Sequence, residues 1–198
     1  ERIIPYKSRT SKFRMHWLGD IHLGTVHCSE HKLQERIRQI KDDPLAIWGG
    51  IGDYCEFISP SDPRWDVHCC ADWLDDKDNI AELETKAIVK LFTPIKDKCI
   101  GLLEGNHEIA YRLHSHGNVQ ANICERLGLK NLGYTSFVKL VFRRFGSHGS
   151  EFLGVVSNGA GCAITPGAKM ARLERFMNAF DARWYAHGHV HDILVNTK

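Results

Sequence analysis

The chain has 198 residues, of which 43% are hydrophobic and 25% are charged. This size and balance are typical of one globular domain with a real core, and they exclude a disordered or fibrous chain. The formal net charge of +2 gives no overall argument for a nucleic-acid or anionic-membrane partner, so any basic binding face must be local. We therefore expect a single domain over residues 1–198.

Cysteine use and hydrophobicity indicate the compartment. The seven cysteines are scattered and form no Cys-x-x-Cys pattern, which is typical of proteins in a reducing compartment. No apolar run is long enough to span a bilayer, and no signal-peptide pattern is found. We expect a cytoplasmic protein without a membrane partner.

Strands and helices alternate along the chain. Apolar runs predict strands at residues 13–18, 45–48, 99–103 and 183–186, and a β-hairpin with strands at 137–145 and 151–156. Helical spacing predicts a helix that begins after Ser29, and further helices at 78–92, 119–127 and 168–180. The irregular stretch 54–76 is expected to be a long functional loop or a small cap inserted into the domain.

A polar, glycine-rich loop follows each of five predicted strands. In α/β folds, sites gather beyond the carboxyl ends of the strands, so these loops can converge although they are far apart in sequence. Carboxylate, amide and imidazole donors together suit Mn, Fe or Zn better than Ca or a thiolate-bound zinc. The candidate metal ligands in these loops are Asp20, His22, Asp53, Asn106, Asn158, His189 and His191.

Each of these motifs alone is ordinary, because an isolated Asp-x-His or Gly-Asp is usually part of a solvated loop or a turn. Four motifs, however, occur once each, in order, after predicted strands. Together they resemble the calcineurin-like metallophosphoesterase superfamily: Gly19-Asp20-Ile21-His22, Gly52-Asp53, Gly105-Asn106-His107-Glu108 and Gly188-His189-Val190-His191. The resemblance implies an α/β fold, a four-layer α-β-β-α sandwich with two mixed β-sheets flanked by helices.

The resemblance also implies a site for two divalent metal ions, with Mn²⁺ as the first choice and Fe, Zn, Ni or Mg as alternatives. Asp53 would bridge the two ions. The remaining ligands would divide between a first ion, held by Asp20, His22 and His191, and a second ion, held by Asn106 and His189. Two such ions can share a bridging hydroxide that attacks phosphorus in line.

Two further residues match catalytic positions of the family. His107 corresponds to the histidine that stabilises the transition state or protonates the leaving alkoxide. An acidic residue three positions after the bridging aspartate often orients that histidine, and Glu56 stands there. The resemblance therefore implies a His107–Glu56 pair.

Asn158 departs from the family pattern, which has a histidine followed by glycine where this chain has Asn158-Gly159. Three interpretations remain open. Asn158 ligates through its amide oxygen, or it is a natural or engineered replacement that lowers activity, or another histidine substitutes for it. His148 is a poor substitute, because a strand rising about 3.3 Å per residue separates it from Asn158.

The resemblance implies a phosphoester substrate, and the surroundings of the site must decide which class of phosphoester it is. Trp65, on the 54–76 stretch, could stack a base, although aromatic residues there could equally pack the stretch onto the domain. Arg112, in the expected loop 111–116, could border the cleft. The first hypothesis is a phosphodiesterase acting on nucleic acid or nucleotides, similar to the DNA-repair nucleases of the superfamily, with DNA or RNA as partner. The alternatives are a phosphomonoesterase acting on a phosphoprotein or small molecule, and a weakened or inactive metal-binding variant.

Overall fold

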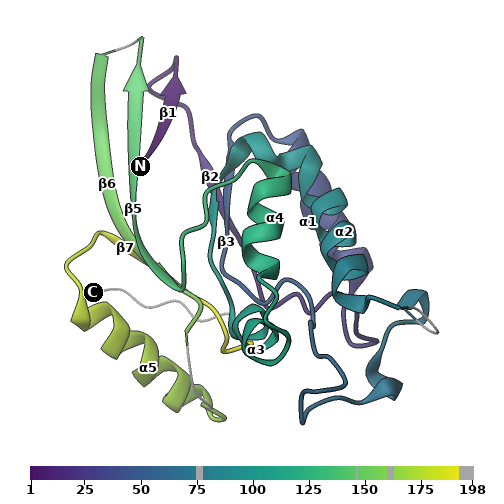
Figure 1. The fold of residues 1–198 in the computed structure, drawn as a ribbon. Helices are drawn as coiled ribbons and strands as arrows, with labels where there is room; N and C mark the ends of the chain where they lie inside the picture. The colour runs from purple at the N-terminus through teal and green to yellow at the C-terminus, as the bar shows by residue number, and fades with distance from the viewer. Residues whose placement is uncertain (75–77, 146, 160–162, 192–198) are drawn as a thin grey trace.

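The computed structural model describes residues 1–74, 78–145, 147–159 and 163–191, which form a mixed α/β fold with two β-sheets (Figure 1). The strands are β1 (Arg2–Tyr6), β2 (Arg14–Leu18), β3 (Ala46–Gly50), β4 (Cys99–Leu102), β5 (Thr135–Arg144), β6 (Ser147–Ser157) and β7 (Trp184–His187). The five α-helices in these residues are α1 (Glu30–Asp42), α2 (Ile80–Phe92), α3 (Asn106–Ser115), α4 (Val119–Leu127) and α5 (Pro166–Ala179). Short 3₁₀-helices are η1 (Val67–Cys69), η2 (Asp72–Leu74) and η3 (Thr93–Lys98).

The two sheets differ in strand direction. The three-stranded sheet, in the order β2-β3-β4, is entirely parallel. The four-stranded sheet, in the order β1-β5-β6-β7, is mixed, because β5 and β6 form an antiparallel hairpin while β1 and β7 run parallel to their neighbours. The prediction of two mixed sheets is therefore wrong for the first sheet. Helices α1 and α2 connect its strands, and such crossovers return the chain to the same end of the sheet.

The two sheets share a hydrophobic core. Its buried residues come from both sheets and the segments that continue them: Ile4, Val138, Leu140, Val156 and Ala186 from the four-stranded sheet, and Ile47, Ile100 and Leu103 from the three-stranded one. The rings of Trp17 and Trp184 lie 5.6 Å apart in this core. Trp184 can lie flat on its own sheet because Gly154 opposite it has no side chain; a Cβ there would come within 2.0 Å of the indole.

Helices α1, α2 and α4 cover the other face of the three-stranded sheet (Figure 1). Each turns an apolar stripe inward, as the helical spacing of their apolar residues requires. The buried residues of the three stripes are Leu33, Ile37, Ile40, Ile88, Phe92, Val119, Ile123, Cys124 and Leu127. Trp48 of β3 is fully buried beneath them and donates its indole N–H to the carbonyl of Ile95 at 2.7 Å. The three-stranded sheet is thus covered on both faces.

Most predicted elements are confirmed, with ends that differ by a few residues. The predicted strands correspond to β2 to β7, and the predicted helices to α1, α2, α4 and α5. The stretch 54–74 is irregular apart from η1 and η2, and residues 75 and 76 lie outside the described part of the chain. No helix within the described ranges is both long and apolar enough to cross a bilayer.

The sequence patterns do not predict β1 and α3. Strand β1 contains Pro5, which interrupts a strand pattern but is tolerated because β1 lies at the edge of its sheet. The expectation of a loop at 111–116 is wrong, because helix α3 runs through Ser115. Gly105 precedes the helix, and the side chain of Glu108 in its first turn accepts the backbone N–H of Gly105 at 2.9 Å.

Candidate metal centre

Five loops meet beyond the carboxyl ends of β2, β3, β4, β6 and β7. Backbone N–H groups of one loop bind side-chain or carbonyl oxygens of another. The N–H of His189 donates to both carboxylate oxygens of Asp20, at 3.0 and 2.9 Å, and the N–H of His107 donates to Oδ1 of Asp53 at 3.0 Å. The N–H of Asp20 donates to the carbonyl of Gly52 at 3.1 Å. The loops therefore form one hydrogen-bonded unit.

Three groups of side chains in this unit could each hold a cation: one is His22, Glu56 and His107, and the other two consist only of candidate metal ligands. In Asp20, His22 and His191, one possible ligand atom from each residue lies within 4.8 Å of the others. The same holds for Asp20, Asp53 and His189. Asp20, His22 and His191 are the three residues that, besides Asp53, are expected to hold the first ion. The other group contains Asp53 and His189, which are expected to hold the second ion. Because Asp20 belongs to both groups, two ions in these positions would be neighbours.

The chemistry of the donor atoms fits metal ions. Three atoms that would face an ion are buried and have no hydrogen-bond partner among the described residues: His22 Nε2, Asn106 Oδ1 and His189 Nδ1. An unpaired buried polar atom costs about 1–3 kcal/mol, and a bound cation would satisfy such an atom. Burial, and then the charge of Asp53, raise the pKa of Asp20. Two carboxylates this close in a buried site favour a compensating positive charge.

The backbone at the candidate ligands is strained. Five of the seven candidates have the left-handed conformation, which non-glycine residues adopt at a cost of about 1 kcal/mol or more each. They are Asp20 (φ 50°), His22 (φ 49°), Asp53 (φ 54°), His189 (φ 66°) and His191 (φ 49°). Strain that gathers at converging polar side chains is typical of a functional site, where the surrounding structure holds an unfavourable geometry.

Two glycines allow the loops to approach one another. Gly52 has φ +88°, and a Cβ there would come within 2.5 Å of the Gly105 backbone and 2.7 Å of the Asn158 amide. A Cβ on Gly105 would come within 2.2 Å of the Asp53 nitrogen and 2.5 Å of Glu108. A side chain at either position would separate the loops that carry Asp53, Asn106 and Asn158.

Glu108 holds these loops together, and the sequence motif gave no role to it beyond its place after His107. Its carboxylate is buried and accepts the backbone N–H groups of Asp53 at 3.0 Å, Tyr54 at 2.9 Å and Gly105 at 2.9 Å. Burial, and then the charge of Asp53, raise the pKa of Glu108 to about 7. Glu108 thereby fixes the backbone that presents Asp53.

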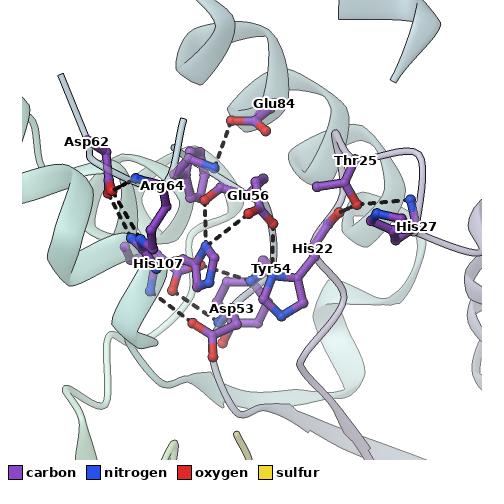
Figure 2. Close-up of polar contacts among 12 residues, drawn as sticks. His22, Thr25, His27, Asp53, Tyr54, Glu56, Asp62, Arg64, Glu84 and His107 are labelled. Carbon is purple, nitrogen blue, oxygen red and sulfur yellow. Dashed lines mark hydrogen bonds and ion pairs between the residues drawn. The ribbon is translucent and has the colours of Figure 1, made fainter. Parts of the chain in front are cut away.

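His107 and Glu56 lie together, but the contact uses the backbone. Nδ1 of His107 donates to the carbonyl oxygen of Glu56 at 2.7 Å, while the Glu56 carboxylate is 3.9 Å away. That carboxylate instead binds Nδ1 of His22 at 3.0 Å (Figure 2). Burial, and then the charge of His22, lower the pKa of His107. The contact commits Nδ1 of His107 and leaves Nε2 as the ring nitrogen that can serve a substrate.

The 54–74 stretch brings one further charged group to the site. Arg64 forms a two-pronged ion pair with the buried carboxylate of Asp62, with nitrogen–oxygen distances of 3.1 and 2.8 Å (Figure 2). The hydrogen bonds to Asp62 are the main cause that raises the pKa of Arg64, and the charges of Glu56 and Asp53 raise it further. Arg64 therefore lies within electrostatic reach of Asp53. Sequence patterns do not predict a role for Arg64, since nothing about an isolated arginine near two prolines marks a site.

The two residues expected to contact substrate lie differently. Trp65 is half-buried and lines a small cavity with Glu56, Arg64 and Glu84, beside the site. Arg112 lies on α3, is exposed, and pairs with Glu104 at 3.3 Å. Trp65 is thus placed beside Glu56, whereas Arg112 reaches the residue that precedes the Gly105 loop.

Asn158 follows the end of β6 and is completely buried. Its Nδ2 donates to the carbonyl of Ile51 at 2.7 Å and to Oδ2 of Asp53 at 3.1 Å. His148 is near the start of β6, where its backbone lies opposite that of Arg143 in β5, so the length of the strand separates it from Asn158. Asn158 therefore lies directly beside the carboxylate of Asp53.

No protein-family model matches this sequence, and no curated protein matches it. A function for this protein must therefore be inferred from its residues and their arrangement.

Proposed function

We propose that this protein is a metal-dependent phosphoester hydrolase of the calcineurin-like metallophosphoesterase type, with a dinuclear site. One observation carries the proposal. Two groups of candidate ligands, drawn from loops that are far apart in sequence, meet at Asp20 and Asp53 in a partly buried, strained site. Neighbouring cation positions that share carboxylates are the arrangement used to bind and cleave phosphoesters.

Asp20, His22 and His191 would hold the first ion, Asn106 and His189 the second, and Asp53 both. When bound, the ions supply a nucleophilic water and neutralise charge on the phosphate oxygens. The chain's own contribution is orientation. Glu56 holds the His22 ring, and its carbonyl oxygen holds the His107 ring, leaving His107 Nε2 to donate a hydrogen bond or a proton to the leaving oxygen.

The four-layer sandwich is part of the proposal. The shared core of the two sheets, and helices α1, α2 and α4 outside one of them, supply three of its layers. Helix α5 would contribute to the fourth. The ring of Phe176 lies 6.1 Å from Tyr185 of β7, and Phe180, directly after the helix, lies 5.7 Å from Phe137 of β5. These contacts support a helical layer on the outer face of the four-stranded sheet.

For the substrate we propose a phosphodiester of nucleic acid or a nucleotide. A diester carries one negative charge between two organic groups, so its site needs a cation for the phosphate and a surface for the groups on either side. Arg64 and Trp65, neighbours on the 54–74 stretch beside Glu56, are suited to these two tasks. A phosphomonoesterase remains the second candidate, and the experiment below separates the two.

The test compares bis-p-nitrophenyl phosphate with p-nitrophenyl phosphate, each with Mn²⁺, with the alternative ions and with a chelator. We expect Mn²⁺-dependent hydrolysis of the diester that exceeds hydrolysis of the monoester, and loss of both with the chelator. Asp53→Asn should abolish turnover, whereas Asp42→Asn, on the exposed end of α1, should not. A preference for the monoester would favour the second candidate. Hydrolysis of neither ester by metal-loaded protein would contradict both.

Nucleic acid as the natural substrate needs its own measurement. Labelled single-stranded and double-stranded DNA, and RNA of the same sequence, are incubated with the Mn²⁺-loaded protein at low salt. Cleavage of any of them that the chelator stops would support the proposal. Hydrolysis of the small diester without cleavage of any of the three would restrict the substrate to nucleotides or other small diesters.

A further inference from the structure

The amide of Asn158 has one permitted orientation. Its Nδ2 lies 2.7 Å from the carbonyl oxygen of Ile51 and 3.1 Å from Oδ2 of Asp53. A carbonyl oxygen can only accept a hydrogen bond, so the amide nitrogen, and not the amide oxygen, must face Ile51. The second N–H of the same nitrogen then donates to Asp53. Both amide protons are used in a completely buried place.

The two oxygens of Asp53 consequently have different neighbours. Oδ1 accepts the N–H of His107 at 3.0 Å, whereas Oδ2 accepts from Asn158 and lies 3.7 Å from Nδ1 of His189. Oδ2 is therefore the oxygen on the side of His189, one of the residues that would hold the second ion. The N–H of Asn158 uses one lone pair of Oδ2 and brings a partial positive charge to it.

A histidine at this position would act differently. A neutral imidazole has one nitrogen that donates and one that can bind a metal, so it can do both at once. If the Asn158 amide turned its oxygen toward Asp53, that oxygen would face the carbonyl of Ile51 and a carboxylate, two acceptors in a buried place. The hydrogen bonds of the present orientation make that turn unfavourable.

We propose that Asn158 is a positioning residue that holds Asp53 through Nδ2, rather than a metal ligand, and that the two ion positions are therefore unequal. The inference rests on the proposed metal site. The first ion, with Asp20, His22, Asp53 and His191, is bound tightly. The second ion has only Asn106 and His189 besides Asp53, and it is bound weakly. The chain thus works with one resident ion and one that exchanges.

The test measures Mn²⁺ binding to the metal-free protein. Calorimetry gives the dissociation constants, and electron paramagnetic resonance distinguishes an isolated Mn²⁺ from a coupled pair. We expect one tight ion and a second whose dissociation constant is at least about 10-fold higher, which is the usual scale for losing one supporting interaction. Asn158→His should bring the two constants together and give the coupled signal at two equivalents. Two equally tight ions in the unchanged protein would overturn the inference.

Asn158 Oδ1 is buried without a partner, so ligation through that oxygen is the alternative to exclude. Asn158→Asp keeps the shape, adds a ligand oxygen and removes the N–H donor. A positioning role predicts that the first ion weakens by about 10–100-fold, because the new carboxylate repels Asp53 and cannot donate to the Ile51 carbonyl. A ligand role predicts that the second ion tightens, and that result would overturn the inference.

Asn158→Ala covers the case in which the aspartate variant does not fold. Loss of positioning weakens the first ion as well as the second, whereas loss of a ligand weakens the second alone and would contradict the inference. None of these readouts needs turnover. If two Mn²⁺ ions bind with unequal affinity but the protein cleaves no phosphoester, the proposed function fails and this inference stands. If the two ions bind equally tightly in an active hydrolase, the inference fails and the proposed function stands.

Discussion

The carboxylate of Glu108 accepts the backbone N–H of Asp53 at 3.0 Å across 55 residues of sequence. The same side chain binds the N–H groups of Tyr54 and Gly105, so a single buried carboxylate joins the loop after β3 to the loop after β4. Asp53 is the residue on which both proposed ions depend. The position of the Asp53 carboxylate is thus set by a side chain that is not itself one of the proposed metal ligands.

Glu108→Gln should weaken this joint without changing its shape. An amide offers one accepting oxygen and places N–H groups against at least one of the three backbone donors, which costs about 1–3 kcal/mol of unfolding free energy. Urea unfolding of the metal-free protein measures the loss. Glu125→Gln on the exposed side of α4 is the control and should change stability by less than about 0.5 kcal/mol. Equal effects of both substitutions would contradict the role given to Glu108.

His107→Asn should lower kcat by about 10²–10⁴-fold, the usual contribution of a general acid or base, while Mn²⁺ content stays unchanged. The reason is that His107 touches Asp53 through its backbone N–H, which the substitution keeps, and Glu56 through its ring, which the substitution removes. Metal analysis beside steady-state kinetics gives both quantities. A variant that loses its metal would show instead that the His107 ring is needed to build the site.

Arg64→Ala should raise the KM for the diester by roughly 10–150-fold, because a charge-assisted hydrogen bond is worth about 1.5–3 kcal/mol. Asp62→Asn should act in the same direction and less strongly, since it loosens the guanidinium without removing it. Arg112→Ala, which removes an exposed arginine paired with Glu104, is expected to raise KM less than Arg64→Ala. If Arg112→Ala had the larger effect, substrate would lie over α3 rather than under the 54–74 stretch.

Two glutamates of α2 should give opposite pH dependences of stability. Burial raises the pKa of Glu84 well above its ordinary value, so the folded state holds that proton more tightly than the unfolded state, and Glu84 lowers stability as pH rises above about 4.3. Glu84→Gln should therefore gain stability relative to the unchanged protein as the pH rises above about 4.3.

Glu82 is the matched control on the same helix. Burial opposes ionisation of Glu82, but the hydrogen bonds from Arg126 and Lys86 outweigh it and lower the pKa. Its stabilising contribution is present above about pH 4.3 and is lost as the pH falls through the depressed pKa. Because the pair is exposed, Glu82→Gln should cost no more than about 1 kcal/mol at neutral pH. Chemical denaturation at several pH values gives the free energy of unfolding of both variants. If the free energies of Glu84→Gln and Glu82→Gln, relative to the unchanged protein, depended on pH in the same way, the opposite pKa shifts of the two glutamates would be contradicted.

The strands that present the candidate ligands could be predicted from the sequence, because buried strands are continuous apolar runs and each ends in a glycine-rich polar loop. The convergence of those loops followed from one rule about the carboxyl ends of strands. Strand β1 could not be predicted because Pro5 breaks its pattern. Helix α3 could not be predicted because its first turn carries the polar motif in place of an apolar stripe.

The supporting contacts could not be predicted in the same way. The roles of Glu108 and Asn158 depend on backbone groups of Asp53 and Ile51, which are distant in sequence and become neighbours only in the folded chain. Arg64 gains its place from Asp62, whose burial no local pattern reveals. The identity of candidate ligands is a local property of the chain, whereas their orientation is a property of the assembled loops.

The backbone is left-handed at five of the proposed metal ligands: Asp20, His22, Asp53, His189 and His191. At these positions the side chain that would bind the metal also lowers the stability of the metal-free fold. Glycine would adopt that backbone at the least cost, about 1 kcal/mol less than a residue with a side chain, and it would bring no ligand. Directed evolution for heat resistance in metal-free medium would therefore favour glycine at these positions and remove the site. The same selection with Mn²⁺ present would keep them, because an ion that binds only the folded state adds its binding free energy to stability.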